Sequence, residues 1–259
     1  FWMWLTGLVG MATKYSEGFL AVKYRHLNEH GEISGGPMYY IEYGLGQKWL
    51  GTCFAMFGAL AAFGIGNMIQ SNTIASSLSE TLGTNNFLVG IILALLTGMV
   101  VIGGIKRIAD VASYFVPLMV LVYFIGASIV ILNNLPQLGS GVELIFEHAF
   151  TGTAATGGFA GATLAQSIRF GVARGLFSNE SGMGSAPIVA AAAKTNHPGK
   201  QALVSMTGTF LDTLIICSLT ALALSSSGVW VSGETGVTLT IQAFSTGLPG
   251  NWGNIIVTL

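Results

Sequence analysis

The chemically most distinctive run of residues lies at positions 175–187, where glycines and polar side chains interrupt an otherwise helical stretch. We expect residues 164–177 to form one half-helix and residues 186–194 to form another. A break of this kind frees backbone N–H and C=O groups, and inside a bilayer these must be satisfied by protein, solute or ion. One half-helix end can hold a carboxylate and the other can offer carbonyls to a cation. The run therefore predicts a site for an amino-acid zwitterion.

The alternative for this run is a cytoplasmic loop between two full helices. The whole interrupted segment, residues 158–194, is long for one span of a bilayer, which needs about 20 residues. It is short for two spans with a loop between them. Its length therefore favours a broken helix over a loop.

A second polar pattern precedes it, at residues 63–70. Phe63, Asn67 and Gln70 are spaced i, i+4 and i+7, so on a helix they share one face. A ring and two amides on one stripe suit a small polar solute with an apolar side chain. Asn and Gln also hydrogen-bond between helices in membrane bundles. The spacing favours neither interpretation.

Six ionisable residues lie within apolar segments, where a charge costs about 2.5–3.5 kcal/mol on insertion scales. Lys14 and Glu17 are spaced i, i+3 and are expected to form a local ion pair on one helix face. Glu180 belongs to the broken run described above. The other three are one carboxylate, Asp212, and two basic residues, Arg169 and Arg174.

Asp212 is flanked by two hydroxyl residues, Thr209 and Thr213. This setting suits a cation or proton site. Asp212 could equally be the buried partner of Arg169 or Arg174, and this structural role is the one we favour.

Composition places all these residues in a membrane protein. Of 259 residues, 52% are hydrophobic and only 8% are charged, whereas soluble chains carry about 25% charged residues. Apolar runs at 87–105, 111–132 and 203–224 each approach the length of a bilayer span. Backbone groups in lipid must be satisfied within the segment, so these runs are expected to be helices. The predicted fold class is an all-α, multi-pass (polytopic) membrane protein.

Seven hydrophobic segments follow one another along the chain. They lie at about 1–25, 50–79, 86–105, 109–133, 158–194, 201–226 and from beyond 238. Seven of the ten basic residues fall in alternate joints between them. The positive-inside rule makes these joints, residues 23–48, 106–107 and 194–200, cytoplasmic. The first segment then runs inward, and the outer joints suit short re-entrant or helical pieces.

The remaining composition excludes several functions. A net charge of −1 with no basic cluster gives nothing for nucleic acid to bind. Cys53 and Cys217 have no motif spacing and the four histidines are scattered, so we expect no cofactor and no resident metal centre. No HExxH motif, nucleophile elbow or paired catalytic carboxylates indicate an enzyme, and no repeated ring of lining residues indicates a channel.

The 36 glycines include two GxxxG pairs, at Gly157/Gly161 and Gly171/Gly175. In so glycine-rich a chain we interpret them as close helix packing rather than as dimerisation motifs. The chain begins and stops inside apolar segments, so we expect a single transmembrane domain, residues 1–259, truncated at both ends.

Several long motifs resemble the alanine or glycine:cation symporter family. They are GGPMYYI at 35–41, FSNESGMGSAP at 177–187 and AAAKTNHP at 191–198, supported by FWMW at 1–4, GMATK at 10–14 and the run at 63–70. The resemblance covers essentially the whole chain. One departure is Ser181, where the family usually has alanine.

The resemblance implies a transporter of the prokaryotic plasma (inner) membrane that couples entry of Na⁺, or sometimes H⁺, to uptake of alanine or glycine. It implies the five-plus-five inverted-repeat, leucine-transporter-like fold, whose first and sixth core helices are broken at the midplane. This chain would hold about core helices 2 to 8. The segments at 1–25, 158–194 and beyond 238 would then be core helices 2, 6 and 8.

The resemblance also implies a substrate site. Gln70, with Asn67 and Phe63, would line it from core helix 3. Its other members would come from the break: Phe177, Ser178, Asn179, Gly182 and Met183. A small pocket closed by Phe177 and Met183 would explain a preference for small side chains. The main sodium ligands are expected outside this chain, in core helix 1 and late in core helix 8.

Overall fold

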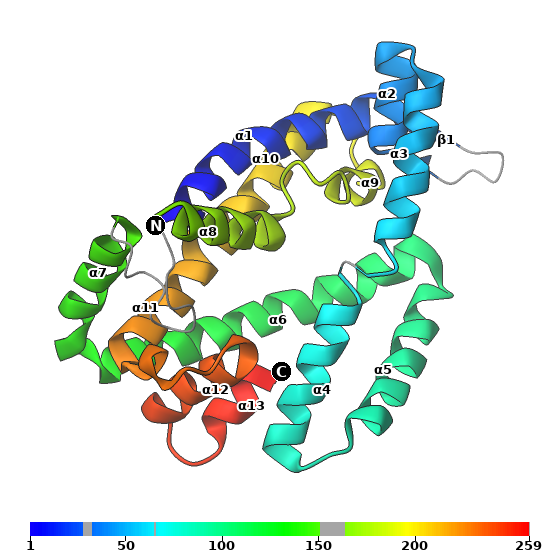
Figure 1. Cartoon of the computed structure of the whole chain (residues 1–259). Helices are drawn as coiled ribbons and strands as arrows, with labels where there is room; N and C mark the ends of the chain where they lie inside the picture. The colour runs from blue at the N-terminus through cyan, green and yellow to red at the C-terminus, as the bar shows by residue number, and fades with distance from the viewer. Residues whose placement is uncertain (28–32, 65, 151–163, 259) are drawn as a thin grey trace. The chain divides into compact units, whose positions relative to one another are not determined.

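The computed structural model describes residues 1–27, 33–64, 66–150 and 164–258. The chain divides into two compact units. Unit 1 comprises Phe1–Ile65 and Ala165–Ile215, and unit 2 comprises Gly66–Leu164 and Ile216–Leu259. Both are built almost entirely of helices (Figure 1).

Unit 1 is assembled around its first helix, α1. Its elements are α1 (Trp2–Lys23), the strand pair β1 (His26–Leu27) and β2 (Ile33–Ser34), α2 (Pro37–Leu45), α3 (Lys48–Ala61), α8 (Leu164–Asn179), α9 (Ala186–Ala191), α10 (Pro198–Thr209) and the π-helix η1 (Phe210–Ile216). The strands are antiparallel, with His26 opposite Ser34 and Leu27 opposite Ile33. This pairing is a small departure from the all-α expectation.

Glycines let other helices approach α1 closely. A Cβ on Gly7 would lie 2.9 Å from Thr213 Cγ2, and one on Gly18 would lie 2.6 Å from Ser205 Oγ. On α8, a Cβ on Gly171 would lie 2.6 Å from the Cβ of Trp2. The packing interpretation of Gly171/Gly175 is therefore confirmed, since both face α1. The pair Gly157/Gly161 lies outside the described residues.

Unit 2 holds the remaining elements. They are α4 (Met68–Leu82), α5 (Asn86–Val101), α6 (Gly104–Asn133), α7 (Leu135–Phe150), α11 (Cys217–Ser227), the 3₁₀ turn η2 (Val229–Ser232), α12 (Gly236–Gly247) and α13 (Trp252–Thr258). α7 is one of the helical pieces expected in an outer joint. Beyond residue 238 the chain forms two short helices rather than one.

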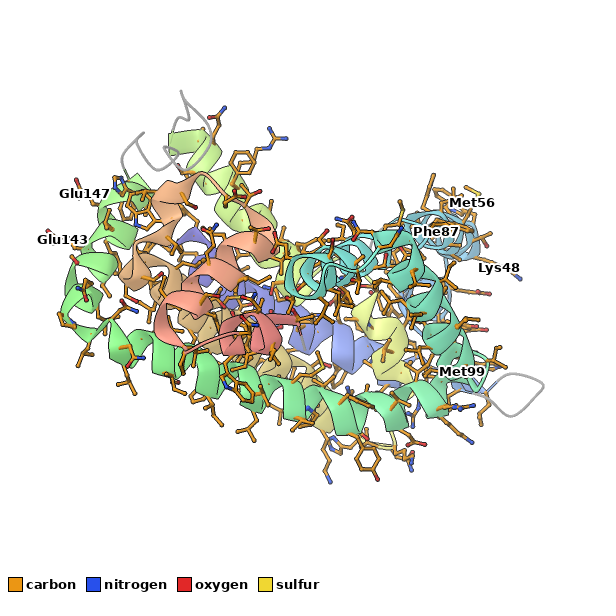
Figure 2. All side chains as sticks on the ribbon, turned by 90° about the horizontal axis from the view of Figure 1, so that it is seen from below. Lys48, Met56, Phe87, Met99, Glu143 and Glu147 are labelled. Atoms are coloured by element: carbon orange, nitrogen blue, oxygen red, sulfur yellow. The ribbon has the colours of Figure 1, made fainter. Side chains whose placement is uncertain are left out.

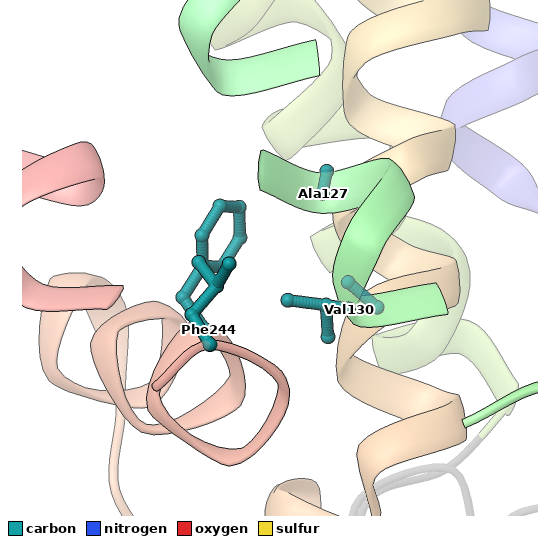
Figure 3. Close-up of a cluster of buried hydrophobic side chains, with 5 residues drawn as sticks. Ala127, Val130 and Phe244 are labelled. Carbon is teal, nitrogen blue, oxygen red and sulfur yellow. The ribbon is translucent and has the colours of Figure 1, made fainter. Parts of the chain in front are cut away.

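The buried core of unit 2 joins α6, α11 and α12. Phe244 and Val130 are fully buried, and Ala127 lies beside them (Figure 3). Asn133 Nδ2 donates a 2.6 Å hydrogen bond to the carbonyl of Gly247, where α12 ends. Packing and this bond together fix α12 against α6.

Among the described residues, two helices are long and apolar enough to cross a bilayer by length and composition: Gly104–Asn133 and Pro198–Ser227. The shorter α5 is also apolar. Its large side chains point away from the protein, with Phe87 78% and Met99 54% exposed (Figure 2). Soluble monomers rarely expose contiguous apolar faces of this kind. Such a surface suits contact with lipid chains.

The prediction of a single helix over residues 50–79 is wrong. α3 ends at Ala61 and α4 begins at Met68, with turns between them. Gly66 has φ +89°, in the left-handed region that glycine adopts without a steric penalty. The predicted stripe of Phe63, Asn67 and Gln70 on one helix face is therefore absent. Phe63 belongs to unit 1, and Asn67 and Gln70 belong to unit 2.

The other long segments agree with the structure within a few residues. Segments 1–25, 86–105, 109–133 and 201–226 correspond to α1, α5, α6 and the run α10–η1–α11. The break in segment 158–194 is present, although the second half-helix is shorter than expected and ends at Ala191. The inverted repeat and the numbering of core helices 2 to 8 remain predictions.

Candidate functional site at the helix break

The break between α8 and α9 is an unwound turn at residues 180–185. Gly182 and Gly184 have φ of +80° and +81°, and Glu180 has φ +54°. A non-glycine residue in this region costs about 1–3 kcal/mol, so its surroundings must hold it there. The Glu180 N–H donates to the carbonyl of Leu176 at 2.8 Å, and the Ser185 hydroxyl donates to Glu180 Oε2 at 2.7 Å. Both bonds stabilise the turn.

The last turn of α8 is tied to the π-helix η1. Ser178 Oγ donates to Asp212 Oδ2 at 2.6 Å, and Thr213 Oγ1 donates to the same oxygen at 3.1 Å. Asn179 Nδ2 donates to Thr213 Oγ1 at 3.3 Å. Wide π-turns are rare and occur frequently at functional sites. Here the π-turn places a carboxylate against the broken helix.

A polar cleft of about 310 Å³ opens between α1, the break and α10–η1, entirely within unit 1. Its lining residues carry charges, hydroxyls or amides apart from one glycine: Lys14, Ser178, Asn179, Glu180, Ser205, Gly208, Thr209 and Asp212. An ammonium and two carboxylates therefore face one small space. Chemically, the cleft can accept the opposite charges of a zwitterion or a hydrated cation.

Lys14 and Glu17 are both buried, at 7% and 8% exposed. They do not form the predicted close ion pair, because the one salt bridge within 4.0 Å in the described part of the chain joins Lys48 to Glu42, although the charges of Lys14 and Glu17 still act on each other. Lys14 instead lines the cleft, and Glu17 Oε1 accepts the Gly182 N–H at 3.2 Å. The two residues thus serve different neighbours on the same helix.

The predicted pairing of Asp212 with a buried arginine is also wrong. Arg169 and Arg174 are exposed, and neither forms a salt bridge to Asp212 among the residues that the structure describes. The Arg174 guanidinium lies 5.9 Å from the ring centroid of Phe177. Asp212 is stabilised by hydroxyl donors instead, and the alternative of a cation or proton site stays open.

Three buried oxygens around the break have no hydrogen-bond partner in the described part of the chain: Glu17 Oε2, Ser181 Oγ and Thr209 Oγ1. Buried polar atoms are normally paired, so each exception calls for an explanation. Thr209 is 3% exposed and lines the cleft. Unpaired oxygens here are what a site for a small polar guest or an ordered water would present.

The structure brings some predicted site residues together and leaves others apart. Ser178 and Asn179 line the cleft, whereas Phe177, Gly182 and Met183 do not. Phe63 and Met183 are 78% and 40% exposed. Asn67 caps α4, since its side chain accepts the Met68 N–H at 2.7 Å. Their roles in substrate binding, like that of Gln70, stay predictions.

The sequence interpretation missed Ser205 and did not connect Thr209 with the break. With Asp212 these two residues follow the spacing i, i+4, i+7, which marks one face of a helix. This polar stripe in an otherwise apolar segment is the sequence pattern that could have predicted their place at the site. It is the face that borders the cleft.

A broken helix beside a polar cleft, in an apolar helical chain, is typical of a membrane transporter. The sequence model of the sodium:alanine symporter family matches residues 1–259. The chain belongs to this family, and the resemblance inferred from the motifs is confirmed.

Curated relatives share the similarity over the whole chain. An uncharacterized transporter of Haemophilus influenzae is 49% identical over 100% of the chain and 57% of its own length. The sodium/alanine symporter AgcS of Methanococcus maripaludis is 46% identical over 100% of the chain and 58% of its own. The probable sodium/glutamine symporter GlnT of Bacillus subtilis is 40% identical over 98% and 52%. The chain thus spans slightly more than half the length of these relatives.

Proposed function

We propose that the protein is a secondary active symporter that couples sodium entry to the uptake of alanine or glycine across a prokaryotic plasma membrane. The observation that carries the proposal is the break at residues 180–185, whose neighbours Ser178 and Asn179 border a cleft with Lys14 and Asp212. The similarity to a relative named a sodium/alanine symporter supports the substrate and the ion.

In this proposal, transport follows from differential affinity. Sodium and the amino acid bind together at the break, and their joint binding favours the closed and then the inward-open state. Freed backbone groups at the break, with Ser178 and Asn179, orient the substrate. The family resemblance also proposes Gln70, Asn67 and Phe63 as substrate contacts, and Phe177 and Met183 as limits on the side chain that fits.

The proposed orientation places residues 23–48, 106–107 and 194–200 in the cytoplasm. One contact supports it: Arg25 Nη2 donates to the carbonyl of Thr195 at 2.7 Å. Two of the three basic joints therefore lie at the same end of unit 1. A positive-inside arrangement requires these two joints to be on one side of the membrane.

Glutamine is a second candidate substrate, because a relative 40% identical carries the name of a probable sodium/glutamine symporter. Protons are a second candidate for the coupling ion, since another relative is named a putative sodium/proton-dependent alanine carrier. Family membership favours transport over the enzyme alternative. A passive channel would carry solute down its own gradient without regard to sodium.

The test uses the full-length protein in liposomes with labelled alanine, glycine and glutamine. Uptake of alanine or glycine above the external concentration, driven by an inward sodium gradient and absent with potassium, is expected. The Ser178→Ala variant should weaken uptake, and Ser113→Ala is the matched control, because its exposed hydroxyl bonds only to a carbonyl of its own helix. Uptake indifferent to sodium, or equal loss in both variants, contradicts the proposal.

A further inference from the structure

From residue 171 onward, α8, the break and α9 approach α1 one after another along its length. On α8, Gly175 faces Thr6, with an added Cβ only 3.0 Å from the Cβ of that residue. At the break, Gly10 faces Ser181, with a Cβ only 2.8 Å from its hydroxyl oxygen. Beyond the break, α9 continues beside the second half of α1. α1 therefore backs both half-helices and the turn between them.

The half-helix α9 cannot be stable by itself. It has six residues, and isolated helices shorter than about 12 residues are marginal in water even with good helix formers. Neighbours must therefore hold it. Ala191 is 1% exposed and lies against Gly35, while Ile188 lies against Gly36.

Glu17 on α1 holds the beginning of this segment. Its Oε1 accepts the N–H of Gly182 at 3.2 Å, a donor that the break has freed from helical bonding. The carboxylate is buried, so this bond forms in a poorly solvated place, where charge-assisted bonds are strong. Lys14 and Glu180 are the charged groups that act on Glu17 at the break.

Arg25, eight residues further along, holds the other end. Its Nη1 donates to the carbonyls of Ala191 at 3.1 Å and Ala193 at 2.8 Å. Its Nη2 donates to the Thr195 carbonyl at 2.7 Å and to Asn196 Oδ1 at 3.2 Å. The last carbonyls of a helix lack intrahelical partners. One planar guanidinium therefore satisfies the end of α9 and the turn that follows it.

We infer that Glu17 and Arg25 are positioning residues that fasten the break and α9 beside α1, and so hold the backbone that borders the cleft. The fastening rests on these hydrogen bonds, and its effect on uptake rests on the proposed function. An anion anchors the donor-rich end and a cation anchors the acceptor-rich end. Neither residue lines the cleft, so both act through the backbone that borders it.

Hydrogen exchange of the full-length protein tests the fastening without any transport assay. Arg25→Gln is expected to speed exchange of the backbone amides of residues 186–196 about tenfold, and Glu17→Leu that of Gly182. Lys23→Gln is the matched control: it removes the same charge two residues before Arg25, at the end of α1, where the Lys23 ammonium lies over the rings of Phe19 and Tyr24. Glu17→Gln keeps an acceptor oxygen and is expected to restore slow exchange.

Uptake measurements separate positioning from folding. We expect Arg25→Gln and Glu17→Leu to raise the KM for alanine about tenfold, with normal amounts in the membrane, and Lys23→Gln to stay near wild type. Unchanged exchange in Arg25→Gln overturns the inference, as does exchange that rises equally in α3. If the wild-type protein shows no sodium-driven uptake, the proposed function fails while the exchange pattern still decides the fastening.

Discussion

Ser178 Oγ and Asp212 Oδ2 lie 2.6 Å apart, joined by a hydrogen bond from the end of the first half-helix to the π-turn of the neighbouring helix. The two residues are 34 positions apart in the sequence. Asp212 receives a second bond from Thr213 and no arginine in the described part of the chain reaches it. Two hydroxyl groups therefore stabilise its charge at the edge of the cleft, and the effect of removing each one can be predicted separately.

Removing the carboxylate of Asp212 should impair transport more than removing one donor. Hydrogen bonds to charged groups are worth about 1.5–3 kcal/mol. Ser178→Ala should therefore raise the KM for alanine about tenfold or more. Asp212→Asn keeps the shape but removes the charge, and should also raise the sodium concentration needed for half-maximal uptake.

Sodium-activation curves at fixed alanine measure this difference. Thr213→Val is a second comparison: it removes the longer of the two bonds to Asp212, together with the bond that Thr213 accepts from Asn179. If Asp212→Asn shifts only the alanine KM and leaves the sodium curve in place, the carboxylate has no part in ion coupling.

Close packing on α1 predicts an unusual response to alanine. Alanine normally stabilises a helix relative to glycine by about 1 kcal/mol. Gly7→Ala should instead lower the thermal unfolding temperature in detergent, because the new Cβ would lie 2.9 Å from Thr213 Cγ2. Gly58→Ala, on α3, would place its Cβ 3.8 Å from the Phe54 ring and should be neutral or stabilising. Equal effects at the two positions would contradict this packing.

Asn67 offers a way to separate a structural role from substrate binding. Its side chain caps α4, and loss of such a cap costs about 0.5–2 kcal/mol. Asn67→Ala should therefore lower stability, while Asn67→Asp and Asn67→Ser should restore it, since both residues cap well. Thermal unfolding and alanine KM are measured together.

If Asn67 acts only as a cap, the KM recovers with the stability in Asn67→Asp. If it also binds the amino acid through its amide, stability recovers while the KM stays high. Gln70→Ala should raise the KM without a loss of stability, because Gln70 is an exposed residue within α4. Full uptake with an unchanged KM in Gln70→Ala would remove this residue from the predicted site.

The sequence was most informative where the physical signal was local. Long apolar runs located α1, α5 and α6, and the cluster of Gly182, Gly184 and polar neighbours located the break. Both signals depend on residues adjacent in the chain. The matching family motifs covered the same stretch and led to the correct family.

Tertiary contacts were harder to predict because spacing alone does not say which neighbour a side chain meets. Lys14 and Glu17 had the spacing of a close ion pair, yet Lys14 lines the cleft and Glu17 accepts a hydrogen bond from the Gly182 N–H. Phe63 and Gln70 had the spacing of one helix face, but α3 ends at Ala61, before Phe63, and α4 begins only at Met68.

Two phenylalanines of unit 2 provide the last prediction. Phe244 is fully buried between α6 and α12, whereas Phe87 on α5 is 78% exposed (Figures 2 and 3). Phe244→Ala leaves a cavity, and at about 24 cal/mol per Å³ a void of roughly 100 Å³ costs about 2 kcal/mol. Phe87→Ala removes contacts with lipid or detergent that refill readily, because lipid tails are as apolar as the side chain. The thermal unfolding temperature should therefore drop by several degrees for Phe244→Ala and hardly change for Phe87→Ala. A comparable drop for Phe87→Ala would mean that α5 presents this face to a protein partner rather than to lipid.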